Sequence, residues 1–392
     1  MISFDEAVER IRSVARPIGS ESVGIADAAG RVLAAPVVAA IDSPRCNVSA
    51  MDGYALREEG LNARAPLRIL GESFAGAGWD GEVSAGTCAR IFTGAPVPRG
   101  ADRVVMQENV RREGDLALVE TQPGPARHIR KRGSDFAAGD ELLAAGRLLD
   151  PRAIVAAAAA DVSKVGVHRQ PRLAILSTGD ELAEPGAARE RMDAIPESVS
   201  FGVAALARQW GATHHSTTRL RDDLATMKTA ATAAIEDSDI VVVTGGASVG
   251  EKDFAKAMFD PLELIFSKIA IKPGKPVWLG RAGKALVVGL PGNPTSALVT
   301  ARLVLAPLLA GIGGRSIDEA LRWRRALLLS DLGECGARET FHRAQLLDDG
   351  VSILGFQDSS AQKALAAADV LVRQRACGPA KNSGETVEIL DF

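Results

Sequence analysis

A glycine-rich turn followed by charged residues is the clearest chemical feature of the sequence. The segment TGGASVG is followed at once by EKD and comes directly after the β-branched run DIVVV. Gly245 and Gly246 tolerate positive φ and let the backbone approach a ligand closely. Successive N–H groups in such a turn attract anions, Ser248 adds a hydroxyl, and Asp253 supplies an oxygen of the kind that binds Mg²⁺ beside phosphate. The pattern is typical of a phosphate site, although a plain tight turn before an acidic helix start shares it.

Two other segments have the same character at the end of an apolar run. In LSTGDEL, the polar cluster consists of Thr178, Gly179, Asp180 and Glu181. In GLPGNP, Gly292 turns the chain, Asn293 is the expected helix cap and Pro294 starts the helix. That arrangement leaves free N–H groups at the positive end of the helix dipole. Each segment alone is a weak signal, but three neighbouring strand ends that favour anions predict one site for a phosphate-type ligand.

The segment SKIAIKPGKP supplies cations that would balance an anionic ligand. It contains Lys268, Lys272 and Lys275. If residues 268–271 form a strand, Lys268 and Lys272 share one face, because side chains alternate with a period of two. A solvated edge strand protected by lysines is the alternative interpretation.

These segments need a scaffold that brings them together, and the pattern between residues 169 and 314 supplies one. Apolar runs and amphipathic segments alternate there, which predicts βαβ units and a parallel sheet with helices on both faces. We expect strands at residues 172–178, 212–220, 239–246, 262–271 and 285–292. We expect helices at residues 197–211, 222–237 and 293–314, the last of them breaking near Pro307. Ligands of such sheets bind beyond the carboxyl ends of the strands, where the three turns lie.

The remainder of the chain predicts further domains around this region. The expected division is residues 1–42 with 133–168, residues 43–132, residues 169–314 and residues 318–392. The first is an elongated mixed domain, with a helix that Ser3 caps and a second helix that Asp150 caps. Short apolar runs between Gly/Pro-rich turns make the second a β-rich insertion. The last returns to short strands and predicts a small β-domain.

Composition excludes several classes of function. The 392 residues carry a net charge of -3 and a single tyrosine, so neither a global basic field nor aromatic platforms favour nucleic acid. The four cysteines form no CxxC pair, which leaves zinc and iron–sulfur sites without support. The N-terminal segment lacks the apolar core of a signal peptide, and the tract AIVAAAAADV is too short to cross a bilayer. We therefore expect a cytoplasmic protein without a membrane partner.

The sequence resembles a known family, the molybdopterin molybdenumtransferases or MoeA family, which includes the gephyrin E domain. The resemblance extends from about Ser3 to Gly314 and continues more faintly to the C-terminus. The pairing of MDGYA with GLPGNP is its most specific part. The matching motifs are SAMDGYA, IFTGAPVP, RGSD, STGDEL, LRDD, GGASVGEKD, KPGKP and GLPGNPTSA, in that order.

The resemblance implies a fold and a reaction. The implied fold is α/β and multidomain, with a three-layer parallel-sheet domain of the molybdopterin-binding type, a β-rich insertion, an elongated N-terminal mixed domain and a small C-terminal β-barrel. The implied reaction is the insertion of molybdate into the dithiolene of adenylated molybdopterin, with Mg²⁺-dependent release of AMP. An elongated homodimer is also implied, with the active site between the subunits, and a molybdopterin adenylyltransferase is a possible docking partner.

The resemblance also implies roles for individual residues. The acidic set around the metal and the leaving group is Asp52, Glu181, Asp222 and Asp253, of which the last three are the expected Mg²⁺ ligands. The expected contribution of the facing subunit is Asp135 and Thr93. The expected contacts to phosphate or molybdate are Lys268 and Lys272, and the expected molybdate pocket is Lys275, Pro276, Arg343 and Ser359. The expected contacts to the pterin nucleotide are Thr178, Gly179, Gly245, Gly246, Ser248, Pro291, Gly292, Asn293 and Pro294.

One segment departs from the family pattern. Where the family carries an IxDSN-like stretch, this chain has IPESVS, so that Val199 replaces an asparagine, Pro196 a common tyrosine and Glu197 an aspartate. The change removes a polar contact to the nucleotide or pterin. One alternative is therefore that the chain is a catalytically weakened paralogue that acts as a molybdopterin-binding scaffold. An adenylyltransferase is the other alternative, but the GGTG turn expected of that enzyme is GGAS here.

Overall fold

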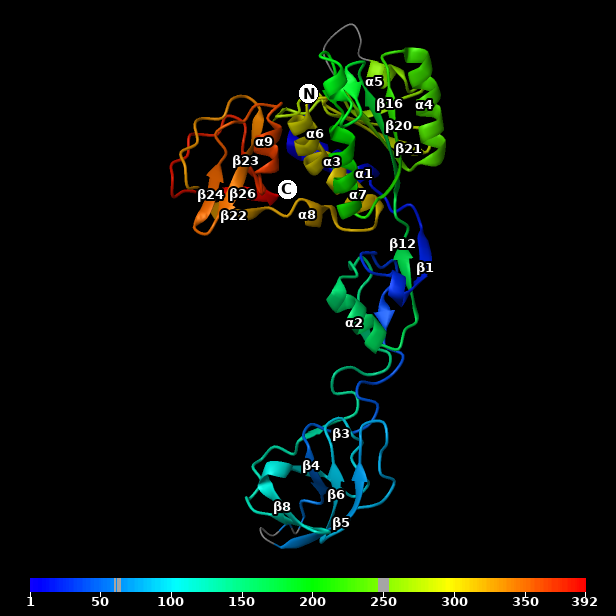
Figure 1. Cartoon of the computed structure of the whole chain (residues 1–392), viewed down its shortest axis with the longest axis vertical. Coiled ribbons are helices and arrows are strands. Elements are labelled where there is room, and N and C mark those ends of the chain that lie inside the picture. The colour runs from blue at the N-terminus through cyan, green and yellow to red at the C-terminus, as the bar shows by residue number, and fades with distance from the viewer. Residues whose placement is uncertain (60, 62–64, 246–253) are drawn as a thin grey trace.

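The computed structural model describes residues 1–59, 61, 65–245 and 254–392. The chain is elongated (Figure 1). One end holds an α/β body, with a second sheet from the C-terminal residues beside it. A small middle part connects this body to a separate β-sheet at the far end. The N- and C-terminal ends of the chain both lie at the α/β body and its neighbouring sheet.

The α/β body is built on a six-stranded sheet with the order β16-β13-β17-β21-β20-β18. Its strands are β13 (Arg172–Thr178), β16 (Thr213–Leu220), β17 (Ile240–Thr244), β18 (Glu263–Phe266), β20 (Trp278–Ala282) and β21 (Ala285–Leu290). The first four in the order run parallel, whereas β20 and β18 are antiparallel to their neighbours. The prediction of a purely parallel sheet is therefore wrong. The segment WLGRA is a strand that the sequence reading missed, and Gly283 (φ 55°) allows the tight turn that folds it back onto β21.

Helices cover both faces of this sheet, as expected. One face packs against α1 (Phe4–Val14), α3 (Val199–Gln209) and the helix that begins at Pro294, and together they form the largest apolar cluster. The other face packs against α4 (Leu224–Asp237), which contributes Met227 and Ala231 to a second cluster. The cap predicted at Ser3 is present, because its hydroxyl accepts from the Glu6 amide at 3.1 Å. The Asp223 side chain caps α4, a cap that the sequence reading did not include.

The helix that follows Asn293 does not break near Pro307, contrary to the prediction. It comprises α6 (Pro294–Thr300), a π-helical segment (Ala301–Leu305) and α7 (Ala306–Ile312). The wider π-turn leaves Pro307 in the first turn of α7, where its missing N–H group removes no α-helical hydrogen bond. Among the described residues this is the one helix long and apolar enough to cross a membrane, but 94% of its most apolar window is buried in the protein, as in a core helix.

The predicted strand 262–271 is in fact two strands in different sheets. Its first half is β18, in the central sheet, and its end forms β19 (Ile271–Lys272), which pairs with β23 (Glu339–Leu347). Phe266 and Ile271 are both buried in the same apolar cluster. Because one core covers both strands, apolar periodicity alone does not reveal the crossing between them.

The C-terminal sheet has the order β19-β23-β25-β26-β22, and β24 pairs with β23. Its other strands are β22 (Arg324–Leu327), β24 (Gly350–Ile353), β25 (Val370–Gln374) and β26 (Thr386–Asp391). A bridge between Leu328 and Val351 connects the end of β22 to β24. Two short helices flank the sheet in the chain, α8 (Ile317–Ala320) and α9 (Gln362–Ala366).

The middle part consists of short antiparallel pairs around α2 (Pro151–Ala159), whose N-cap Asp150 accepts from the Ala153 amide at 2.8 Å. The pairs are β1 (Ser20–Gly24) with β12 (Lys164–His168) and β2 (Val37–Val38) with β11 (Glu141–Leu143).

The sheet at the far end of the molecule, which we call the insertion sheet, has the order β7-β4-β6-β5-β9-β8. Its strands are β4 (Gly53–Leu56), β5 (Pro66–Ser73), β6 (Thr87–Ile91), β7 (Arg103–Met106), β8 (Val110–Glu113) and β9 (Leu116–Val119). The pair β3 (Val48–Ser49) and β10 (Ile129–Arg130) lies where the chain enters and leaves it.

Candidate active site

A cavity of about 710 Å³ lies at the carboxyl ends of four neighbouring strands of the central sheet. We call it the rim cavity. Its lining comes from the segments after β13, β16, β17 and β21, from the loop before α3 and from the turn before α9. The lining residues are Thr178, Gly179, Glu181, Leu182, Ile195–Val199, Asp222, Thr244, Gly245, Pro276, Pro291–Pro294, Ser360 and Gln362. The described parts of the three predicted turns therefore converge on one site.

Two of the turns touch so closely that glycine is required. Gly245 has φ 88°, and a Cβ there would lie 2.4 Å from the Thr178 carbonyl oxygen. A Cβ at Gly292 would lie 3.4 Å from the Gly245 Cα. The Ser177 and Thr244 hydroxyls are 2.8 Å apart beneath them. The strand ends thus pack directly on one another and form a continuous floor of the rim cavity.

The acidic side of the rim cavity is formed by Glu181 and Asp222. The Asp222 amide donates to Asp180 Oδ1 at 3.3 Å, which ties the segment after β16 to the segment after β13. The Glu181 carboxylate folds back over Gly179, where an added Cβ would meet its oxygens at 2.7 Å. The predicted residues Gly246, Ser248 and Asp253 lie outside the described part of the chain.

Two of the three carboxylates that line the rim cavity, Glu181 and Asp222, are of the kind that Mg²⁺ uses. Within residues 1–59, 61, 65–245 and 254–392, no group of three His, Cys, Asp or Glu side chains forms a preassembled metal site. Mg²⁺ is commonly held by one or two carboxylates together with substrate phosphates and water. Glu181 and Asp222 therefore fit a metal that arrives with a phosphorylated ligand, and they fit a resident all-protein metal site less well.

Beside the turn before α9 lies a buried arginine with unused donors. The Arg343 side chain belongs to a residue that is 1% exposed, and its Nη1 donates to the Ala361 carbonyl at 3.4 Å. Its Nε and Nη2 are buried and have no hydrogen-bond partner among the described residues. Burial lowers the pKa of the guanidinium from its ordinary value, against the opposing effect of Asp358.

The Asn293 side chain contacts the same turn before α9, where its Nδ2 donates to Ser359 Oγ at 3.0 Å. Asn293 occupies the N-cap position of α6 as predicted, but its side chain makes no capping hydrogen bond with any described residue.

The predicted lysines do not line the rim cavity. Lys268 lies in the connection between β18 and β19, so the expected strand that would place it on one face with Lys272 does not form. Lys275 is exposed in the turn that leads to Pro276, which does line the cavity. Lys272 lines a different cavity.

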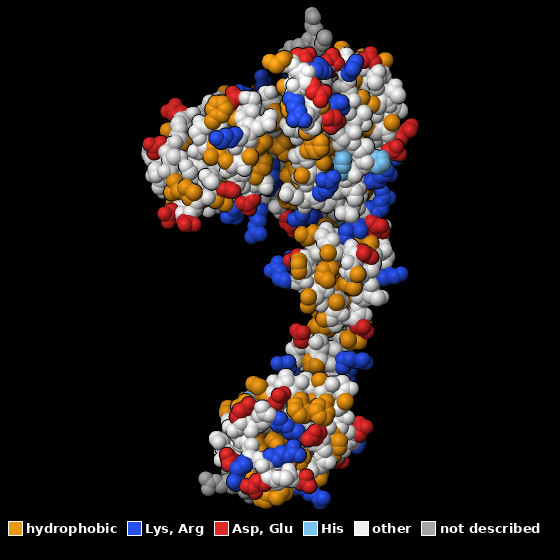
Figure 2. Space-filling model, in the orientation of Figure 1, with side chains coloured by type: hydrophobic (Ala, Val, Ile, Leu, Met, Phe, Trp, Pro, Cys, Tyr) orange, Lys and Arg blue, Asp and Glu red, His pale blue; other side chains and the backbone are white. Residues whose placement is uncertain are grey.

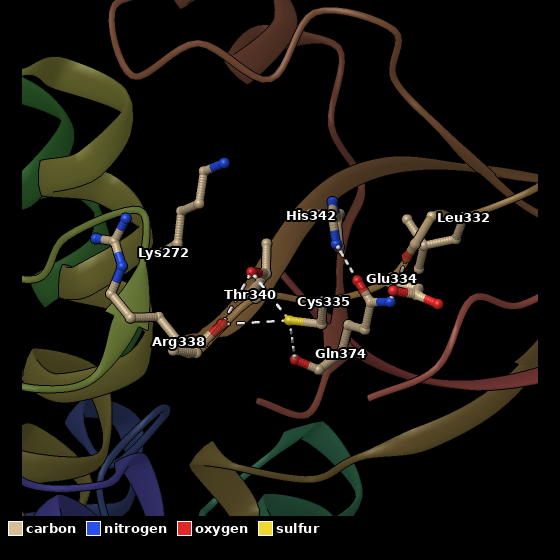
Figure 3. Close-up of a pocket in the computed structure, with 11 residues that line it drawn as sticks. Lys272, Leu332, Glu334, Cys335, Arg338, Thr340, His342 and Gln374 are labelled. Carbon is tan, nitrogen blue, oxygen red and sulfur yellow. Dashed lines mark hydrogen bonds between the residues drawn. The ribbon is translucent and has the colours of Figure 1, made fainter. Parts of the chain in front are cut away.

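That second cavity, here the β23 cavity, has a volume of about 430 Å³ and lies against the C-terminal sheet. Figure 3 shows Lys272 and Arg338 on one side and the hydrogen-bonded pair His342 and Gln374, 3.0 Å apart, on the other. Burial lowers the pKa of His342, and the charges of Lys272 and Arg343 lower it further. Neighbouring side chains on a strand point to opposite faces. The side chain of His342 faces the β23 cavity, so the guanidinium of Arg343 lies on the other side of β23.

Three predicted residues lie far from the rim cavity of their own chain. Asp52 and Thr93 are at the insertion sheet, where Asp52 Oδ1 accepts from the Thr93 amide at 2.7 Å and from its hydroxyl at 2.8 Å. These two bonds lower the pKa of the Asp52 carboxyl. Asp135 is exposed between β10 and β11. The insertion sheet and the α/β body are at opposite ends of the molecule (Figure 1), so these side chains do not join the rim cavity within one chain.

Comparison with known proteins places this geometry in a family. Residues 2–161 match the model of the MoeA N-terminal region (domains I and II), and residues 174–311 match that of a probable molybdopterin binding domain. A molybdopterin molybdenumtransferase of Haemophilus influenzae is 33% identical, with 100% of this chain and 99% of the relative covered. The chain belongs to the MoeA family. A MoeA relative from Nostoc sp., also named molybdopterin molybdenumtransferase, is 34% identical over 82% of this chain and 76% of its own length.

Solved structures support the same assignment. The molybdopterin biosynthesis MoeA protein from Pyrococcus horikoshii superposes with a TM-score of 0.87 at 27% identity, and 100% of each chain is covered. A second solved structure of that MoeA protein gives a TM-score of 0.83 at 28% identity, covering 100% of this chain and 99% of the other. The likeness thus includes the elongated arrangement of the parts as well as the α/β body.

The segment that departs from the MoeA pattern forms one wall of the rim cavity. Val199 is buried and lines the cavity together with Leu182, Ile195 and Pro196. The expected loss of a polar contact is therefore accompanied by the gain of an apolar surface. Sequence reasoning also missed Ser360 and Gln362, although the Asp-Ser-Ser pattern indicates a turn: the Ser360 amide donates to Asp358 Oδ1 at 2.8 Å.

Glu197 holds this wall in place. It is 6% exposed, and its carboxylate accepts from the Ser177 hydroxyl at 3.2 Å, from the Ser200 amide at 2.9 Å and from the Ser200 hydroxyl. These bonds connect the start of α3 to the end of β13.

We expect Glu197→Ala to lower the free energy of unfolding by about 2–4 kcal/mol, because it leaves the buried amide and hydroxyl of Ser200 without their acceptor. Urea unfolding of the full chain measures the loss. Glu190→Ala is the matched control at an exposed position, and we expect it to change stability by less than about 0.5 kcal/mol. Equal stability of the two variants would show that Glu197 does not anchor the wall.

Proposed function

We propose that this chain is a molybdenum-insertion enzyme of molybdenum cofactor biosynthesis. In the proposed reaction, molybdate enters the dithiolene of adenylated molybdopterin and AMP leaves in a Mg²⁺-dependent step. The observation that carries the proposal is the rim cavity, where the glycine turns, two carboxylates and a nearby unpaired buried guanidinium come together. The relatives named molybdopterin molybdenumtransferase support this reaction.

The buried guanidinium suits molybdate. A buried cation with unused donors is costly unless an anion pairs with it, and Arg offers its donors in a fork that matches oxyanions. Arg343 is in this state, and Ser359 and Asn293 add a hydroxyl and an amide close to the same turn. A tetrahedral dianion such as MoO₄²⁻ would receive hydrogen bonds from these groups at the wall of the rim cavity.

The remaining surfaces suit the pterin nucleotide. Gly245 and Gly292 both line the rim cavity, so backbone N–H groups of these turns would contact pyrophosphate oxygens. The apolar wall of Leu182, Ile195 and Val199 offers a flat heteroaromatic ring a dry surface. Glu181 and Asp222 would hold Mg²⁺, which when bound neutralises oxygen charge at the phosphoanhydride link. The chain's own residues thus seat, orient and partly desolvate a large anion.

We infer that two copies of the chain complete the site. Asp52, Thr93 and Asp135 all lie away from the rim cavity of their own chain. The resemblance assigns Thr93 and Asp135 to the facing subunit, and Asp52 to the acidic set around the metal, which it could join only from a second copy. A cytoplasmic homodimer fits this arrangement. The proposed division is residues 1–42 with 133–168, residues 43–132, residues 169–314 and residues 318–392. The bridge from Leu328 to Val351 supports closure of the C-terminal domain, residues 318–392, into a small barrel.

Val199 favours one alternative, a scaffold that binds molybdopterin without turnover, because an apolar side chain replaces the family's polar one in the cavity. The test is AMP release by the purified full chain with adenylated molybdopterin, Mg²⁺ and molybdate. The enzyme proposal predicts AMP well above the blank only when molybdate and Mg²⁺ are both present. Tight molybdopterin binding by calorimetry with no AMP at saturating protein would establish the scaffold instead, and consumption of ATP with molybdopterin would establish an adenylyltransferase.

A further inference from the structure

A third cavity lies where the middle part meets the α/β body. We call it the joint cavity; its volume is about 300 Å³. Residues 29–32, 148 and 168–170 line it from the side of the middle part, and residues 208–211, 313 and 315 line it from the body. The chain passes between the two parts here, and the Arg169 amide donates to the Gly19 carbonyl at 3.0 Å. The joint cavity is distinct from the rim cavity, with which it shares no lining residue.

The lining of the joint cavity is strongly cationic. Four arginines, Arg31, Arg169, Arg208 and Arg315, line it together with His168. Its described lining contains no Asp or Glu, whereas the rim cavity has three carboxylates, Glu181, Glu197 and Asp222. Lys and Arg side chains are visible at this junction in Figure 2. Cations that converge from two parts of a protein repel one another unless an anion lies between them.

The local partners of these cations neutralise only two of them. Arg31 Nη2 pairs with Glu21 at 2.5 Å and also donates to the His168 carbonyl at 2.9 Å. Arg315 Nε pairs with Glu319 at 3.3 Å, and its guanidinium stacks over Trp210 at 4.6 Å. The Arg208 guanidinium forms a hydrogen bond with His214 Nδ1 at 3.5 Å, and no described carboxylate forms an ion pair with Arg208 or Arg169.

Two buried polar atoms at the same place have no partner. Arg31 Nε and His168 Nδ1 are inaccessible to solvent and form no hydrogen bond with any described residue. Native structures rarely leave such atoms unsatisfied, and a bound water or small ion is one of the ordinary ways in which they are paired. This observation is independent of the charge count, and it shows that the polar groups beside the joint cavity are not all satisfied by the described residues.

We propose that the joint cavity binds a phosphate-type oxyanion, either inorganic phosphate or the phosphate group of a small molecule. The anion receives hydrogen bonds from Arg169 on the middle part and from Arg208 on the α/β body. Because it contacts both parts, it favours the arrangement in which they are close and stiffens the joint between them. The proposal does not rest on the reaction at the rim cavity.

The test is calorimetric titration of the full chain with inorganic phosphate in a low-salt buffer. The variant is the double substitution Arg169→Ala with Arg208→Ala, two exposed side chains whose loss leaves the core intact. The control is Arg57→Ala with Arg112→Ala, which removes the same charge from exposed positions on and beside the insertion sheet. We expect the double variant to bind phosphate at least about tenfold more weakly than the wild type and the control, since each arginine contributes a charge-assisted hydrogen bond.

Amide hydrogen exchange shows where in the chain the bound phosphate acts. We expect phosphate to slow amide exchange at residues 17–20 and 168–171 in the wild type and in the control, and to leave it unchanged in the double variant. Parallel titrations with molybdate and with AMP distinguish the sources of the oxyanion. The site is supported by any of the three anions, phosphate, molybdate or AMP, that binds the double variant more weakly and slows amide exchange at the joint of the wild type. Equal affinity in all proteins for all three probes, or binding without slower exchange at the joint, would overturn the proposal. Neither result depends on AMP release, so the outcome is separate from that of the proposed enzyme function.

Discussion

Replacing Arg343 by methionine is expected to lower molybdate-dependent AMP release by at least about 100-fold while the chain remains folded. Each charge-assisted hydrogen bond to the oxyanion is worth about 1.5–3 kcal/mol, and 1.4 kcal/mol corresponds to a factor of ten. Without its anion, the buried guanidinium has two unpaired nitrogens. Methionine fills similar space with no charge to desolvate, so the melting temperature without ligand should be unchanged or higher.

Thermal unfolding with and without molybdate, together with AMP release, checks this expectation. Wild-type protein should gain stability when molybdate binds, and Arg343→Met should not. The control is Arg325→Met, which removes an exposed arginine from β22 in the same sheet and should behave like the wild type. If Arg343→Met kept turnover within about twofold of the wild type, the guanidinium would have no part in seating molybdate.

The double substitution Glu181→Gln with Asp222→Asn is expected to have the second large effect. Both side chains line the rim cavity, and the amides keep their size while losing the charge that attracts a hard cation. We expect the Mg²⁺ concentration for half-maximal AMP release to rise at least about tenfold and the maximal rate to fall about 100-fold, which corresponds to about 2.7 kcal/mol of barrier.

The measurement is the Mg²⁺ dependence of AMP release, with molybdate stabilisation as a second readout. Molybdate binding should survive, because it depends on Arg343 and not on these carboxylates. Glu184→Gln is the matched control, since this exposed carboxylate pairs with Arg219 and does not line the rim cavity. An unchanged Mg²⁺ requirement in the double variant would remove Glu181 and Asp222 from the metal site.

The strand-end turns were predictable from sequence because their residue types have few other uses. A β-branched run followed by glycine, or by Gly-Asn-Pro, indicates a strand that ends in an open turn. The rule that ligands bind beyond the carboxyl ends of parallel strands then brings Glu181, Gly245 and Asn293 together. The structure places all three in the rim cavity.

The rest of the site could not be predicted because it depends on contacts between distant segments. Ser360 and Gln362 reach the rim cavity only because the C-terminal sheet packs beside the α/β body. The strand pairing of Ile271 with Glu339 joins the same two parts of the chain, and no local sequence pattern predicts it. Arg343 was expected in the molybdate pocket from the family resemblance alone, because the burial of an arginine runs against its usual exposure and no local pattern predicts it.

The central claim is that molybdenum meets the pterin nucleotide in the rim cavity. Anomalous scattering from crystals of the chain soaked with adenylated molybdopterin and molybdate tests it most directly. We expect a molybdenum peak within hydrogen-bonding reach of the Arg343 guanidinium and beside the turn of Asn293. A peak that appears elsewhere, with none in the rim cavity, would contradict it.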